Sequence, residues 1–142
     1  MEQAKTREPS LLGAVYRNAR EASEELLSVL PRVEDEALKH DVTVAVGVYG
    51  AYVSRASRLL AEAEEPPQEA GWMEQFGKRM RTWCVSDAAE MLAEDAERRA
   101  DAMQARIRAL EGARADAESL ELARQLYAYE CEHAEQMRTH IK

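Results

Sequence analysis

The final stretch of the chain, residues 120–142, reads LELARQLYAYECEHAEQMRTHIK. Steps of three and four residues through it select one stripe of side chains, which an amphipathic helix turns toward its neighbours. The stripe consists of Leu120, Ala123, Tyr127, Glu130, Ala134, Met137 and Ile141. A glutamate therefore lies in the middle of a face that we expect to pack inward. His133 follows it by three residues, so the two side chains share one side of the predicted helix.

The length and composition of the chain predict an all-α protein. Its 142 residues are enough for one domain with a hydrophobic core. It contains only 6 Gly and 4 Pro, so most of the chain can be helical, with the prolines marking the breaks. We expect residues 1–9 to be a disordered or frayed arm and residues 10–142 to form a single four-helix-bundle domain.

The charge and the apolar stretches of the chain indicate which partners and which location to expect. The formal net charge of -8 disfavours nucleic acid as a partner, because phosphate backbones are also negative. The longest nearly apolar stretch, Val42 to Val53, has about half the residues needed to span a bilayer. The N-terminus, Met1 to Glu8, is charged and has no apolar run typical of a signal peptide. We expect a cytoplasmic protein with no transmembrane segment.

Capping residues and prolines divide the chain into four predicted helices. The first begins after Ser10 as its N-cap and ends before Pro31. Pro31 fits the turn or the first position of the second helix, whose positive N-terminus suits the acidic run of residues 34–36. This helix runs to about residue 65, where Pro66 and Pro67 follow. The third begins at residues 86–87 and ends at residue 112, and the fourth begins after Asp116 as its N-cap.

The middle of the second predicted helix is apolar on nearly all sides. Val44, Val48 and Ala51 lie opposite its core-facing stripe. An apolar surface of this kind predicts a further partner, and we expect a homodimer that packs there, with Gly47 and Gly50 permitting close approach. The alternative is a β-strand over residues 42–53, since this stretch is rich in β-branched and aromatic residues.

A short amphipathic, Trp-rich segment separates the second and third predicted helices. Residues 71–84 read GWMEQFGKRMRTWC. One interpretation is a docking surface for an anionic partner or a membrane, formed by Trp72, Phe76, Lys78, Arg79, Arg81 and Trp83. The other is a helix that covers part of the bundle. Whether residues 69–110 form one helix, or a crossover segment followed by a helix, stays open.

Residues equally far from the loop between two antiparallel helices lie at the same height. With the last loop near residue 113, Glu130 and His133 are level with positions 96 and 93, beside Glu94. With the first loop near residue 31, His40 and Glu36 are level with positions 22 and 26, beside Glu24 and Glu25. In a crossover topology, Asp87 or Glu90 replaces Glu94. The candidate metal ligands are Glu25, Glu36, His40, Glu94, Glu130 and His133.

Together with this helix layout, two motifs give the chain a resemblance to the ferritin-like superfamily, in particular to small uncharacterised bacterial proteins of that architecture. The motifs are LPRVEDEALKHD, residues 30–41, and Glu130-x-x-His133. The resemblance covers about residues 10–141 and implies a ferritin-like four-helix bundle. Its di-iron members carry Glu-x-x-His on the second and fourth helices, whereas the second helix here offers Glu36 and His40 at a spacing of four.

Two functions follow from these observations. We favour a non-catalytic, dimeric binding or structural module, in which an arginine or the hydroxyl of Tyr16, Tyr49 or Tyr52 neutralises Glu130 and His133 lies at the bundle surface. The alternative that the resemblance implies is a di-iron or di-manganese protein with oxidoreductase or metal-handling activity. We assign no residue as catalytic or cofactor-binding.

Overall fold

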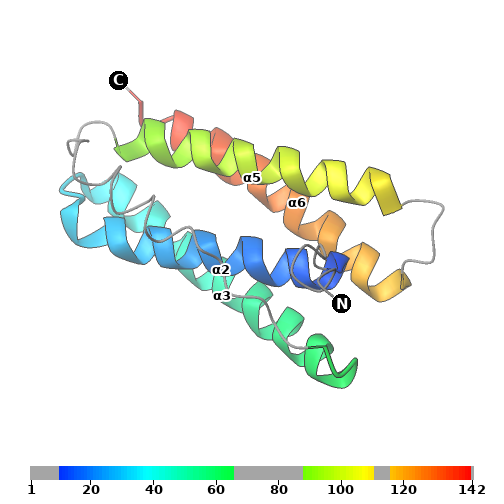
Figure 1. Ribbon diagram of the computed structural model, residues 1–142. Helices are drawn as coiled ribbons and strands as arrows, with labels where there is room; N and C mark the ends of the chain where they lie inside the picture. The colour runs from blue at the N-terminus through cyan, green and yellow to red at the C-terminus, as the bar shows by residue number, and fades with distance from the viewer. Residues whose placement is uncertain (1–9, 66–87, 111–115, 142) are drawn as a thin grey trace, which may run out of the picture.

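The computed structural model describes residues 10–65, 88–110 and 116–141, which form four α-helices and one short 3₁₀ helix (Figure 1). These are α2 (Leu11–Val29), η1 (Leu30–Arg32), α3 (Glu36–Glu62), α5 (Ala88–Leu110) and α6 (Ala117–Arg138). No strand occurs within the described ranges, so the all-α prediction is confirmed and the β-strand alternative for residues 42–53 is wrong. The predicted arm, residues 1–9, and the Trp-rich segment, residues 71–84, lie outside the described residues.

Polar side chains cap the helices at their N-termini. Ser10 Oγ accepts a hydrogen bond from the Gly13 amide at 3.0 Å, and Asp116 Oδ2 accepts one from the Ser119 amide at 3.1 Å. Both predicted N-caps are therefore confirmed. Of the two places that the sequence left open for Pro31, the turn is the one observed, since Pro31 belongs to η1 and Asp35 of the acidic run caps α3.

The Asp116 cap gives a direct test of what positions α6. We expect Asp116→Ala to lower the free energy of unfolding by about 1 kcal/mol, because the amides of the first turn lose their acceptor. Asp116→Asn keeps a side-chain oxygen and should lose less than half of that. Urea denaturation followed by circular dichroism measures both, and equal losses in the two variants would contradict a capping role.

The helices form two antiparallel hairpins, α2 with α3 and α5 with α6, and α2 also packs against α5 and α6 (Figure 1). α3 ends beside the start of α2, where Ser10 Oγ donates a hydrogen bond to Glu65 Oε2 at 2.5 Å. α5 begins at the opposite end of the bundle, so α3 and α5 run parallel (Figure 1). Of the two topologies left open by the sequence, the crossover arrangement, in which α3 and α5 are parallel, is therefore the one observed.

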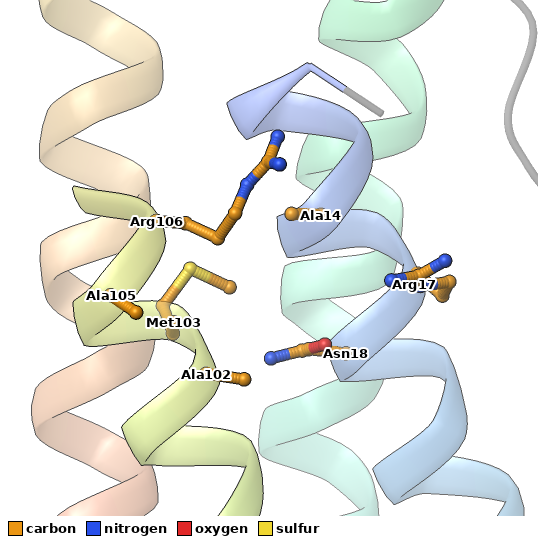
Figure 2. A pocket seen from close by; sticks show the side chains of 7 residues that line it. All are labelled: Ala14, Arg17, Asn18, Ala102, Met103, Ala105 and Arg106. Carbon is orange, nitrogen blue, oxygen red and sulfur yellow. The ribbon is translucent and has the colours of Figure 1, made fainter. Parts of the chain in front are cut away.

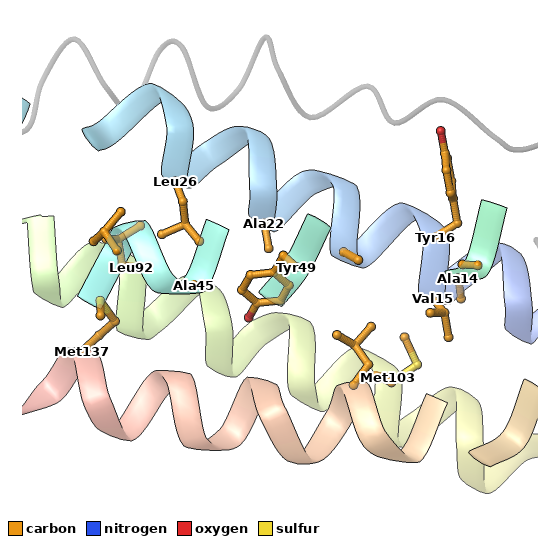
Figure 3. Close-up of a cluster of buried hydrophobic side chains, with 14 of the residues drawn as sticks. Ala14, Val15, Tyr16, Ala22, Leu26, Ala45, Tyr49, Leu92, Met103 and Met137 are labelled. Atoms are coloured by element: carbon orange, nitrogen blue, oxygen red, sulfur yellow. The ribbon is translucent and has the colours of Figure 1, made fainter. Parts of the chain in front are cut away.

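The apolar stripes of the helices meet in one core (Figure 3). Helical spacing predicts one apolar stripe on each of α2 and α3, and their members are buried except for the half-buried Tyr52: Leu12, Val15, Ala19, Ala22, Leu26 and Val29 on α2, and Leu38, Val42, Ala45, Tyr49, Tyr52, Ala56 and Leu60 on α3. In α6 the buried face is wider than predicted, since Leu122 and Leu126 are buried beside the stripe members Ala123 and Met137, and Ile141 is exposed beyond the end of the helix. The reason is that α6 packs on α5, α2 and α3 together, which buries a wider arc than one stripe. None of the described helices is both long enough and apolar enough to span a membrane.

Candidate functional site

A charged residue, Arg99, lies in the middle of α5 at the centre of this core. Its side chain is 3% exposed. Arg99 Nη1 lies 3.1 Å from Glu25 Oε1 on α2, and Arg99 Nε lies 3.3 Å from Glu130 Oε2 on α6. One guanidinium group therefore joins two buried carboxylates from two different helices.

The fourth helix contributes through Tyr49. The Tyr49 hydroxyl donates a hydrogen bond to Glu130 Oε1 at 2.5 Å, and its ring centroid lies 5.9 Å from the Arg99 guanidinium carbon. Figure 3 shows the Tyr49 ring within the core, among the side chains of the other helices. Glu25, Tyr49, Asp95, Arg99 and Glu130 are named here the Arg99 cluster, to which all four described α-helices contribute.

Burial and pairing act in opposite directions on the pKa values of the Arg99 cluster. Burial raises the pKa of Glu130, while Arg99 and the Tyr49 hydroxyl partly oppose that rise. Burial alone would lower the pKa of Arg99, but attraction to Glu130 and Glu25 outweighs it and the pKa is raised. Burial and the neighbouring Glu130 raise the pKa of Tyr49. Arg99 thus stays charged and Tyr49 stays a hydrogen-bond donor at neutral pH.

A second carboxylate lies beside Glu25 in the Arg99 cluster. Burial raises the pKa of Glu25 well above its usual range, and a hydrogen bond with the side chain of Asp95 raises it further. Two adjacent carboxyl groups favour sharing one proton, because both cannot ionise cheaply. Arg98 Nη2 lies 3.6 Å from Asp95 Oδ1 and supplies a further positive charge at the edge of the cluster.

His133 packs against the Arg99 cluster without a hydrogen bond. It is 1% exposed, and neither ring nitrogen has a hydrogen-bond partner among the described residues. Its ring packs edge-on against Tyr49, with centroids 5.6 Å apart, and stacks with Tyr129 at 6.1 Å. Burial and repulsion from Arg99 lower the pKa of His133 to about 4, so the imidazole is neutral at pH 7. The expectation that His133 lies at the bundle surface is therefore wrong.

The structure separates the six predicted metal ligands into two groups. Glu25, Glu130 and His133 are buried, and the first two share Arg99. Glu36, His40 and Glu94 are exposed, as is the crossover alternative Glu90, whereas residue 87 lies outside the described ranges. Among the described residues, no group of three or more His, Cys, Asp or Glu side chains is arranged to hold a metal ion.

The buried donors do not fit a carboxylate-bridged metal centre. In such a centre a metal cation lies between the inward carboxylates, whereas here the Arg99 guanidinium lies between Glu25 and Glu130 and pairs with both. Glu130 also accepts the Tyr49 hydroxyl, so both of its oxygens have protein partners. The predicted partner of Glu130 was an arginine or a tyrosine hydroxyl, and the structure provides both, Arg99 and Tyr49.

Arg99 and Asp95 are the members of the Arg99 cluster that sequence reasoning missed. The sequence predicts an apolar stripe on α5 with a gap of almost two turns between Ala96 and Met103; its members are Ala88, Met91, Leu92, Ala96, Met103, Ile107 and Leu110. Position 99 lies three residues after Ala96 and four before Met103, so helical spacing places it on the same stripe. Arg99 lies in that gap, close to the height of Glu130 on the next helix. This arrangement is the signal in the sequence that could have revealed the Arg99–Glu130 pair.

Comparison of the chain with protein-family models, with curated proteins and with solved structures gave no match. The proposals below rest on the geometry of the described residues.

Proposed function

We propose that the protein is a non-catalytic binding or structural module that acts as a homodimer through α3. The observation that carries this proposal is the outward face of α3, called here the α3 face and formed by Val44, Gly47, Val48 and Ala51. Val44 is 50% exposed, Gly47 and Ala51 are exposed, and Val48 is half-buried. Burial of this apolar surface in a second copy is favourable.

The backbone at the centre of the α3 face is open to close approach. A Cβ atom added to Gly47 or Gly50 would meet nothing within 4 Å, so no side chain of the described chain fills the space beside them. Small residues on one helix face let a second helix approach closely, which increases van der Waals contact between them.

The charges along α3 favour a second copy of the same helix as the occupant. Its first turn carries an exposed Glu36, with the exposed cap Asp35 before it, whereas its last third carries exposed Arg55 and Arg58. Residues 36 and 58 are equally far from Gly47. An antiparallel pair of α3 helices centred there would set Glu36 opposite Arg58 of the partner subunit, twice over by two-fold symmetry.

The Arg99 cluster supports a non-catalytic role. Arg99 and Glu130 are 3% and 0% exposed, so no substrate reaches them without separation of the helices. Their charges balance one another, which fits a contribution to the specificity of packing. We further propose that the bundle is ferritin-like. The parallel arrangement of α3 and α5, each paired with an antiparallel neighbour, supports this assignment.

The dimer is tested with Val44→Glu. A glutamate buried in an apolar interface without a partner should weaken association by about 30-fold or more. Leu27→Glu is the matched control, because Leu27 is 51% exposed and lies on α2. Light scattering coupled to size-exclusion chromatography should give a dimer for the wild-type protein and Leu27→Glu, and a monomer for Val44→Glu. A monomeric wild-type protein, or equal effects of the two variants, would overturn the proposal.

A charge exchange tests the antiparallel geometry separately. Glu36→Arg and Arg58→Glu should each weaken the dimer, because like charges then face each other, and the double variant should restore its affinity. If the double variant does not regain the dimer affinity of the wild-type protein, the antiparallel pairing of Glu36 with Arg58 is refuted. Whether the α3 face forms the dimer is decided separately by Val44→Glu.

A further inference from the structure

The side of α3 next to the α3 face lies against α6. Asp41 Oδ2 near the start of α3 lies 2.7 Å from His140 Nε2, just after the end of α6. Further along α3, Arg55 Nη1 donates a hydrogen bond to Gln125 Oε1 in the first half of α6 at 3.2 Å. The first contact joins a helix start to a helix end, and the second joins later α3 to earlier α6. The two helices therefore run antiparallel beside each other.

One stripe of α3 follows this contact with α6 at spacings of three and four residues. Its members are Asp41, Val44, Val48, Tyr52 and Arg55. Both end members contact α6, and the Tyr52 ring packs against a tyrosine of α6. Between them, Val44 is 50% exposed and Val48 is half-buried, and both belong to the α3 face. A helix that covers these two valines must therefore also pack beside α6.

Tyr129 is the α6 side chain that such a helix would meet. Its ring centroid lies 6.4 Å from that of Tyr52 and 5.2 Å from that of Tyr49. It also stacks with His133 at 6.1 Å. These contacts fix the ring, while the residue stays half-buried. A tyrosine that is fixed before association loses little side-chain entropy, so covering the rest of its surface contributes strongly to affinity.

Charge favours α3 of a second copy as the covering helix. The C-terminal end of α6, where the helix dipole is negative, lies beside the Asp41 carboxylate. The last third of α3 carries exposed Arg55 and Arg58. In an antiparallel pair centred on Gly47, Arg55 of the partner subunit comes level with residue 39, close to Asp41. The basic part of one α3 thus meets the negative end of the other copy's α6.

We propose that α6 forms the second half of the dimer interface, with Tyr129 as its main contact. This inference rests on the proposed dimer and adds a position for the partner's α3. That helix lies over the line where α3 meets α6 and covers Val44, Val48 and Tyr129 together. Each α3 then contacts two helices of the other copy, which buries more apolar surface than a single pair of helices does.

Photo-crosslinking in dimers mixed from isotopically light and heavy full-length chains tests this position. Each variant carries benzoylphenylalanine in place of one exposed residue, Ala51 on α3 or Gln136 on α6. Gln136 lies four residues before His140, so it comes level with Val44 on the antiparallel α3. Both positions should give crosslinks that join a light chain to a heavy chain at α3.

Ala105 is the control position for the crosslinks. It is an exposed alanine of α5 at a pocket of about 360 Å³ between α2 and α5, and no residue of α3 lines that pocket (Figure 2). Benzoylphenylalanine at position 105 should leave the dimer intact and should give no crosslink between a light and a heavy chain.

Tyr129→Ala measures the contribution of the α6 side chain to association. Sedimentation equilibrium should show a dimer that is weaker by about 10-fold or more, with an unchanged circular dichroism spectrum. Tyr127→Ala is the matched control, because Tyr127 is a half-buried tyrosine of α6 that lies near Asp101 and Arg108 on α5. Its effect on association should be below about 3-fold.

The outcomes separate this inference from the proposed dimer. Crosslinks from position 51 but not from position 136, in variants that are both dimeric, would overturn the inference and leave the dimer on the α3 face. No crosslinks from either position would overturn both. Loss of the dimer with the probe at position 136 alone would support the inference, because the bulky group would then lie in the interface. Equal effects of Tyr129→Ala and Tyr127→Ala on association would contradict it.

Discussion

Replacement of Arg99 by methionine should lower the free energy of unfolding by about 3–5 kcal/mol at pH 7. Glu25 and Glu130 are 2% and 0% exposed, so removal of their shared cation leaves two buried carboxylates without a charge partner. Methionine fills a similar volume, which keeps the contribution of a cavity small. The loss should shrink as the pH falls, because protonation of the two carboxyl groups removes the unbalanced charge.

Urea denaturation of Arg99→Met, followed by circular dichroism at pH 7 and at pH 5, measures this effect. Arg108→Met is the matched control, because Arg108 is an exposed arginine of the same helix, and its effect should be below about 1 kcal/mol. Equal losses in the two variants would contradict the role given to Arg99, as would a loss for Arg99→Met that grows on acidification.

The second large effect concerns His133, which should lower the free energy of unfolding as the pH falls. Its pKa is lowered from 6.5 to about 4 in the folded protein. Between these values the unfolded chain binds a proton at His133 and the folded chain does not, so acidification favours unfolding. Above pH 6.5 the imidazole is neutral in both states and does not oppose folding. As the pH falls from 6.5 toward 4, the free energy of unfolding should decrease by about 3 kcal/mol because of His133.

His133→Met isolates this contribution. At pH 7 the variant should be as stable as the wild-type protein or more stable by about 1 kcal/mol, because two buried ring nitrogens without partners are removed. The methionine sulfur can replace the ring contacts with Tyr49 and Tyr129. As the pH falls from 7 to 4, the variant should gain about 3 kcal/mol relative to the wild-type protein.

The free energy of unfolding of His133→Met must be compared with that of the wild-type protein at each pH. The reason is that Glu25 and Glu130 change this free energy with pH in the direction opposite to His133. Their pKa values are raised, so their own contributions favour folding as the pH falls, and these contributions are common to both proteins. His40→Met, at an exposed position, is the control. Its difference from the wild-type protein in the free energy of unfolding should change by less than about 0.5 kcal/mol between pH 7 and pH 4. A pH-independent difference for His133→Met would mean that the pKa of His133 is the same in the folded and the unfolded chain, which would contradict the lowered pKa of the buried imidazole.

Local patterns predicted most of the secondary structure. Ser10 and Asp116 cap the helices as expected because an N-cap depends only on the next three residues. The stripes of α2 and α3 are buried as expected because helical periodicity fixes which side chains share a face. The topology could not be decided in this way, since an up-and-down bundle and a crossover bundle bury the same stripes.

The chemistry of the core was predicted only in part. The expectation that Glu130 lies inward and meets a tyrosine hydroxyl and an arginine follows from one helix and from the high cost of a buried charge. The identity of that arginine depends on which residue of α5 comes level with Glu130, and the loop arithmetic pointed to position 96, one turn from Arg99. A surface position of His133 was expected together with a Glu130 neutralised inside the protein, whereas the structure buries both side chains.

The most direct test of the Arg99 cluster as a self-balanced structural unit is the coupling free energy between Arg99 and Glu130. A double-mutant cycle of Arg99→Met and Glu130→Gln in urea denaturation at pH 7 measures it. If the guanidinium balances the charge of Glu130, the loss caused by Arg99→Met should be smaller in the Glu130→Gln background by about 2–3 kcal/mol. A coupling within about 0.5 kcal/mol of zero would contradict this pairing and would mean that something other than Arg99 neutralises Glu130.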